Sequence, residues 1–147
     1  MSFSRAAALA ALVALISWHA AHSARVFEDK TVPVGQGADA FLSDSRGEAL
    51  QLAADWMREN TVEGETLAVL PEGVMLNYLS RRKSSVPIVN LMPPELLMFG
   101  EDQILAELQE APPSYIALIH KDTSEYGFRF FGQDYAQSIT RWLEQEY

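Results

Sequence analysis

The chain of 147 residues is long enough for one domain with a hydrophobic core, and 48% of its residues are apolar, too many for a disordered chain. Twenty Asp and Glu side chains face eleven Lys and Arg side chains, and the net charge of −9 argues against a nucleic-acid partner, which requires a basic surface. Cysteine is absent, which excludes disulfides, thiolate nucleophiles and zinc sites of the cysteine type.

Residues 1–24 form an apolar segment unlike the rest of the chain. Arg5 is its only charged side chain, and Ala6–Trp18 is apolar apart from Ser17. Two interpretations stay open: a signal peptide, or a short membrane anchor over residues 6–21. Both place Arg5 on the cytoplasmic side and the rest of the chain outside, as a single-span membrane protein or a secreted or periplasmic one. A buried Ala-rich helix of a soluble domain is the less favoured alternative.

Residues 25–44 are predicted to be a connector, because Val32–Gly37 is extended, contains two glycines and lacks a helical period. The remaining residues, 45–147, are predicted to form an extracytoplasmic α/β domain. It begins with an amphipathic helix over about residues 46–59, which Ser43–Ser45 can cap.

Three apolar runs predict the strands of this domain: Leu67–Leu70, Val86–Val89 and Tyr115–Ile119. Helical patterns follow at residues 74–79, 101–111 and 135–143, and a proline-stiffened loop is expected at residues 90–95. Alternating strands and helices predict a small three-stranded, mainly parallel sheet with helices on both faces. Pro87 lacks an N–H group, so its strand should lie at an edge of the sheet.

Polar side chains follow the carboxyl end of each predicted strand: Glu72 after the first, Asn90 and Glu95 after the second, and His120 after the third. Ligands bind beyond this edge in open parallel sheets, so these four residues are candidates for a binding site. Ordinary structural roles are the favoured alternative, with Glu72 in the first turn of a helix and Asn90 in a turn. A glycosidase-like pair of Glu72 and Glu95 is a remote possibility.

Other chemical signals are weaker. The basic pair Arg81 and Arg82 can meet a phosphate or an anionic lipid headgroup, or simply end a helix in solvent. The aromatic residues between 126 and 131 can stack on a sugar or join the core. His19 and His22 lack a third ligand, so no metal site is predicted. No glycine-rich phosphate loop or nucleophile elbow is present, and we predict no cofactor and no catalytic residue.

Four stretches resemble the C-terminal tail of bacterial GT-C class membrane glycosyltransferases of the dolichyl-phosphate-mannose–protein mannosyltransferase type. They are Leu70–Gly73, Leu76–Leu79, Met92–Glu95, and Glu125–Gly127 together with Phe131–Tyr135. The resemblance implies a last transmembrane span at residues 6–21, followed by a small extracytoplasmic α/β domain. Asn77, which lies in the second stretch, is also a candidate residue for substrate or partner binding.

The family's transmembrane bundle, with its catalytic acidic residue, has no counterpart here. The resemblance therefore implies a detached or truncated tail, or a separate subunit, with a recognition or assembly role. Its expected partners are a multi-spanning membrane subunit or a lipid-linked sugar, while the chain alone is not expected to be catalytic. The alternative is a secreted or membrane-anchored small binding module unrelated to sugar transfer.

Overall fold

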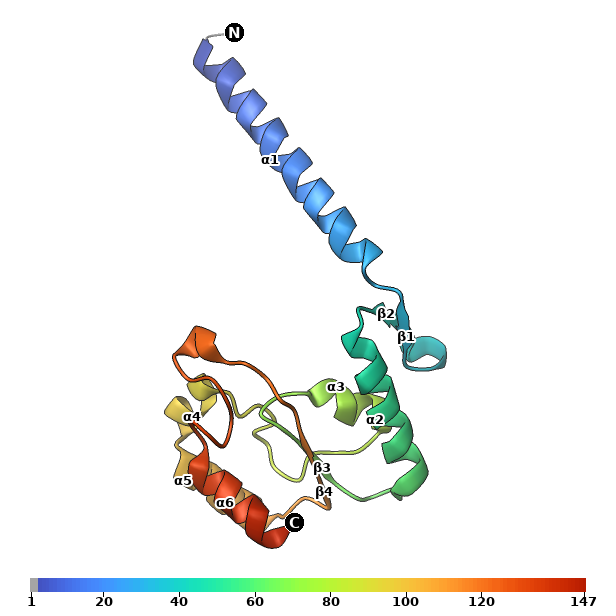
Figure 1. Cartoon of the computed structure of the whole chain (residues 1–147), viewed down its shortest axis with the longest axis vertical. Helices are drawn as coiled ribbons and strands as arrows, with labels where there is room; N and C mark the ends of the chain where they lie inside the picture. The colour runs from blue at the N-terminus through green and yellow to red at the C-terminus, as the bar shows by residue number, and fades with distance from the viewer. Residues whose placement is uncertain (1–2) are drawn as a thin grey trace. The chain divides into compact units, whose positions relative to one another are not determined.

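The structure is a computed structural model that describes residues 3–147 and combines six α-helices in that range with two small sheets (Figure 1). The chain divides into two units, one up to Leu52 and one from Ala53 onward. The helix α2 (Arg46–Asn60) contributes residues to both.

The first unit begins with a long apolar helix, α1 (Phe3–Glu28). Its stretch Arg5–Glu28 is 24 residues long, none of them is buried, and by length and composition it is able to cross a membrane. At 1.5 Å per residue it measures about 36 Å, compared with about 30 Å for the hydrocarbon layer. A signal sequence has the same properties, so both interpretations of residues 6–21 remain open.

A small hairpin follows α1 within the segment that the sequence predicts as a connector. The strands β1 (Val32–Val34) and β2 (Phe41–Ser43) pair antiparallel around the 3-10 turn η1 (Gly37–Asp39). The side-chain oxygen of Gln51 accepts a hydrogen bond of 2.7 Å from the N–H of Gly35, which ties the hairpin to α2. The first unit thus contains regular structure between α1 and α2.

The second unit is organised around the strand β3 (Leu67–Leu70), in which all four residues are buried. It pairs in parallel with β4 (Tyr115–Leu118), as predicted, in the register Leu67 to Tyr115. On one face of this pair, Ala68 and Leu70 join a core with residues of α5 (Glu101–Glu110) and α6 (Gln137–Glu146). On the other face, α3 (Val74–Ser80) packs against β3 (Figure 1).

The third predicted strand, Val86–Val89, does not form, and the prediction of a three-stranded sheet is wrong. The segment is hydrogen-bonded to β3 at its two ends, where Leu67 N–H donates to Lys83 O (2.9 Å) and Leu91 N–H donates to Pro71 O (2.7 Å). Lys83 and Leu91 are eight residues apart in the chain, whereas their partners Leu67 and Pro71 are only four residues apart. The segment between Lys83 and Leu91 is therefore too long to run in register with β3, and it bulges away from that strand. Pro87 also lacks the N–H that a ladder needs.

A helix occupies part of the segment predicted as a proline-stiffened loop. The helix α4 (Pro93–Phe99) has prolines at its first two positions, where their missing N–H groups cost no intrahelical hydrogen bond. It is followed by α5, and the last irregular stretch contains a short 3-10 turn, η2 (Ser124–Tyr126). Prolines that indicate a loop by composition therefore begin a helix here.

Gly73 permits the close turn from β3 into α3. Its φ is +149°, and a Cβ atom there would lie 2.5 Å from Cγ1 of Val69. We expect Gly73→Ala to lower the free energy of unfolding by about 1–3 kcal/mol, since it combines backbone strain with overpacking. Urea unfolding of the full chain in detergent micelles, followed by tryptophan fluorescence, measures this change. Gly64→Ala is the control because its φ is +98° but nothing lies within 4 Å; an equal loss in both variants would contradict the steric argument.

Candidate functional site

The seven candidate residues separate into two groups at opposite ends of β3. Asn77 lies at the beginning of the strand, where its Nδ2 donates to Leu67 O (2.7 Å) and to Arg82 O (3.1 Å). The Arg82 guanidinium donates to the Thr61 hydroxyl (2.6 Å) and to Thr61 O (2.8 Å). Both side chains therefore hold the backbone of neighbouring segments together.

Arg81 is also at this end and completes α3. It adopts a left-handed conformation with φ of 59° at the C-cap, and its guanidinium lies 4.6 Å from the centre of the Tyr78 ring. With Lys83 and Val89 it lines a shallow hollow of about 540 Å³. The Arg81 side chain thus makes local contacts with its own helix, whereas Arg82 contacts Thr61.

The second group, Glu72, Asn90, Glu95 and His120, lies at the carboxyl end of β3. Glu72 forms an ion pair with Lys121 (2.5 Å), and the amide of Asn90 donates to Glu95 Oε1 (3.2 Å). Two backbone hydrogen bonds bring the three segments together: Leu91 N–H to Pro71 O, and Ile119 N–H to Leu70 O (2.7 Å each). The three polar segments therefore meet at one edge, although the second of them is not a strand.

Two of the charged groups at this edge, Glu72 and Lys121, neutralise each other, whereas Glu95 is met by the neutral amide of Asn90. The hydrogen bond that the Lys121 ammonium donates to Glu72 raises the pKa of Lys121 and keeps this group protonated at neutral pH. The remaining member, His120, stacks on the ring of Phe130 with 4.4 Å between ring centres and an angle of 28°. The stacked rings of His120 and Phe130 both line a neighbouring hollow.

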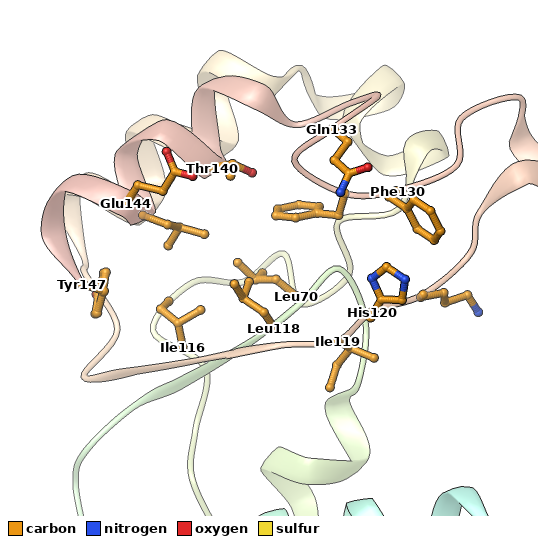
Figure 2. Close-up of a pocket in the computed structure, with 13 residues that line it drawn as sticks. Leu70, Ile116, Leu118, Ile119, His120, Phe130, Gln133, Thr140, Glu144 and Tyr147 are labelled. Carbon is orange, nitrogen blue, oxygen red and sulfur yellow. The ribbon is translucent and has the colours of Figure 1, made fainter.

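That hollow is a cleft of about 460 Å³ between β4 and α6 (Figure 2). Its lining is mainly apolar or aromatic, from β3, β4, α6 and the segment between them. The lining residues are Leu70, Ile116, Leu118, Ile119, His120, Lys121, Phe130, Phe131, Gln133, Thr140, Leu143, Glu144 and Tyr147. An apolar hollow with a few polar groups has the composition of a ligand-binding site.

The cleft follows the whole length of β4. At one end, the hydroxyl of Tyr147 donates to the carbonyl of Pro113, just before the strand begins. At the other end of the cleft lies His120, two residues beyond the end of β4, with the ring of Phe130 stacked on it (Figure 2). Burial raises the pKa of Tyr147, so this hydroxyl stays a hydrogen-bond donor at neutral pH. A ligand in the cleft would therefore lie along the strand.

The wall formed by α6 carries the cleft's one carboxylate, Glu144. Its side chain forms no ion pair with any residue that the structure describes, whereas Lys121 is paired with Glu72. The unbalanced charge of the cleft is thus negative. Within residues 3–147, no three His, Cys, Asp or Glu side chains gather in an arrangement that could hold a metal ion.

Of the seven candidate residues, only His120 lines the cleft. Leu118 looked like a core residue, yet 64% of it is exposed, and Ile119 is 43% exposed. The sequence signal for the cleft was the amphipathic pattern near the C-terminus, which predicts the helix α6. That pattern does not show that α6 leaves part of β4 uncovered. The aromatic segment is divided, with Phe130 and Phe131 in the cleft wall and Phe128 39% exposed.

Comparison with known proteins adds neither a family nor a fold to this geometry. The chain matches no protein-family model, no curated protein and no solved structure. The similarity to glycosyltransferase tails stays a prediction based on the four stretches quoted above.

Asn77 is expected to be a structural residue and Glu72 a dispensable one. Asn77→Ala leaves Leu67 O and Arg82 O without their partner, and we expect it to cost about 1–3 kcal/mol of stability. Glu72→Gln removes an ion pair whose side chains are 39% and 32% exposed, and should cost at most about 1 kcal/mol. Urea unfolding of both variants tests this order, and a larger loss for Glu72→Gln would contradict it.

Proposed function

We propose that the chain is a small binding module attached to, or exported across, a membrane, and that the cleft between β4 and α6 is its binding site. The observation that carries this proposal is the apolar cleft of about 460 Å³, bordered by the exposed side chains of Leu118 and Ile119. Exposed apolar surface next to a hollow is typical of interaction sites.

Binding is favoured over catalysis by the state of the polar groups. A catalytic acid or base needs a tuned pKa and access to the reacting atoms. Here Glu72 and Lys121 neutralise each other, and Asn90 is hydrogen-bonded to Glu95. His120 lies flat against Phe130 and thus offers a surface for packing. These contacts suit the recognition of a ligand better than its conversion.

The proposed location follows from α1. The order of Arg5 followed by an apolar stretch able to cross a membrane is that of an export signal, which favours a location outside the cytoplasm for the residues after the helix. As an anchor, α1 keeps the module at the membrane surface; as a signal sequence, it releases the module into the periplasm or the medium. Both forms leave the binding cleft in the same compartment.

A narrower form of the proposal is an accessory domain for glycosyl transfer from a polyprenyl-phosphate sugar, with a multi-spanning membrane subunit as partner. Its support is the resemblance, together with the proximity of two of the four stretches. Pro71 in the first stretch accepts a hydrogen bond from Leu91, which directly precedes the third stretch, Met92–Glu95. In this form, the strand-end edge contacts the lipid-linked donor, the acceptor or the partner subunit.

We expect a reporter fused after Tyr147 to lie outside the cytoplasm of a bacterial host. An alkaline phosphatase fusion, which requires export, should be active, whereas a green fluorescent protein fusion should be dark. Removal of residues 1–28 is the control and should reverse both signals. Carbonate extraction of the membranes then separates an anchor, which stays in the membrane fraction, from a cleaved signal. Fluorescence without phosphatase activity would contradict the proposed location.

We expect the cleft to bind a small apolar probe. Titration of the full chain in lipid nanodiscs with indole should shift the methyl NMR signals of Ile116 and Leu118. Leu118→Trp should fill the cleft and weaken this binding at least fivefold, while Leu97→Trp is a matched control on α4, at a side chain that is 81% exposed and outside the cleft. Absence of shifts at the cleft methyl groups would contradict the proposed site.

A further inference from the structure

The outer edge of β4 carries unpaired backbone groups. Because Tyr115 N–H donates to Thr66 O (3.0 Å) and Ile119 N–H donates to Leu70 O (2.7 Å), the odd-numbered residues of β4 face β3. Backbone groups alternate along a parallel strand, so those of Ile116 and Leu118 face away from β3. No hydrogen bond to their outward N–H and C=O groups occurs within residues 3–147.

This edge lacks the features that normally protect an exposed strand. Natural edge strands are blocked by proline, inward-pointing charges, bulges or a covering segment. The stretch from Tyr115 to Ile119 has no proline and no charge, and its pairing with β3 is regular over four residues. Leu118 is 64% exposed, so this part of the strand is open to solvent. The edge is thus available to another strand.

The cleft and the free edge belong to the same strand. Ile116 and Leu118 contribute their side chains to the cleft and their backbone groups to the free edge. The cleft also runs parallel to β4, from Tyr147 to His120 (Figure 2). A strand added at the edge would therefore place every second side chain over the cleft, since successive side chains of a strand point to opposite faces.

We propose that the ligand of this cleft is an extended peptide segment of a partner protein, which adds as a third strand beside β4. This inference rests on the proposed binding role of the cleft. Main-chain hydrogen bonds to Ile116 and Leu118 fix the peptide, and its alternate apolar side chains enter the cleft. The unpaired carboxylate of Glu144 in the cleft wall selects a peptide with a Lys or Arg side chain among those that face the cleft.

A hydrocarbon chain fits this arrangement less well. An acyl or prenyl chain would satisfy the apolar lining, but it would displace water from the outward groups of Ile116 and Leu118 without replacing the lost hydrogen bonds. Each buried polar group without a partner costs free energy, whereas a peptide backbone supplies a donor and an acceptor at the required spacing. Glu144 would also have no counter-charge on a hydrocarbon.

The first test selects peptides from a displayed library of random eight-residue sequences, using the full chain in detergent micelles. We expect enrichment of peptides with apolar residues at every second position and one Lys or Arg. Glu144→Lys should change the selected charge to Asp or Glu and keep the alternation, while Glu146→Lys, two residues away and outside the lining, is the matched control. Selection of the same charge by both variants would overturn the role of Glu144.

Hydrogen exchange separates strand addition from simple packing. The enriched peptides should slow exchange of the Ile116 and Leu118 amides at least tenfold, because these two N–H groups become paired. The Ala117 amide already faces β3 and should change far less. Binding without protection at Ile116 and Leu118 would overturn the proposed strand addition, whatever the sequence of the peptide.

Leu118→Pro provides an independent test. Proline removes the outward N–H of residue 118 but no hydrogen bond to β3, so the strand pair is retained. Leu118→Ala is the control, since it removes the side chain and keeps the N–H. We expect Leu118→Pro to bind the enriched peptides at least fivefold more weakly than Leu118→Ala. Equal affinities of two variants that circular dichroism shows to be folded would overturn the proposal. If either variant does not fold, the hydrogen-exchange experiment on the unmodified chain decides instead.

The two proposals can fail separately. If no peptide is enriched while indole still shifts the Ile116 and Leu118 methyl signals, the cleft binds apolar ligands and the peptide proposal is wrong. If neither probe acts on the cleft, the proposed function is wrong as well.

Discussion

Several segments of the second unit are tied together by hydrogen bonds to the four-residue strand β3 and to Pro71, which follows it. At its beginning, Leu67 donates to Lys83 O and accepts from the side chain of Asn77. At its end, the carbonyl groups of Leu70 and Pro71 accept from Ile119 and Leu91. Buried backbone groups must be paired, so a fully buried strand fixes the segments on both of its sides. The polar edge and the cleft are both positioned by this constraint.

Local patterns predicted the elements that local sequence determines. The two real strands of the second unit are uninterrupted apolar runs, and α2 has a clear helical period. Val86–Val89 is also an apolar run, but its pairing depends on the two hydrogen bonds that flank it. These bonds join residues eight apart, Lys83 and Leu91, to residues only four apart, Leu67 and Pro71, so the run cannot pair residue by residue with β3. That mismatch is a tertiary property, and the prediction failed where chain length between two anchors decided the outcome.

The candidate site was predictable in part for the same reason. Glu72, Asn90, Glu95 and His120 meet at one edge because parallel segments end together, a rule of topology that the sequence pattern carries. The cleft depends instead on which surface of β4 remains uncovered by α6. Leu118 is an ordinary apolar residue in the sequence, and only packing shows that most of it is exposed. Exposure is a property of neighbours that lie far away in the chain.

The free edge of β4 does not depend on the missing third strand. The segment from Lys83 to Leu91 lies on the far side of β3, so even a complete third strand there would have left β4 at the edge. After Ile119, the chain turns away, and α6 returns across the face of the pair, which leaves the outer backbone groups open. Because β4 offers only about four residues, an added peptide gains few contacts and binds weakly in solution. If α1 is a membrane anchor, confinement near a membrane partner would raise the effective concentration and allow such a weak, short pairing to be occupied.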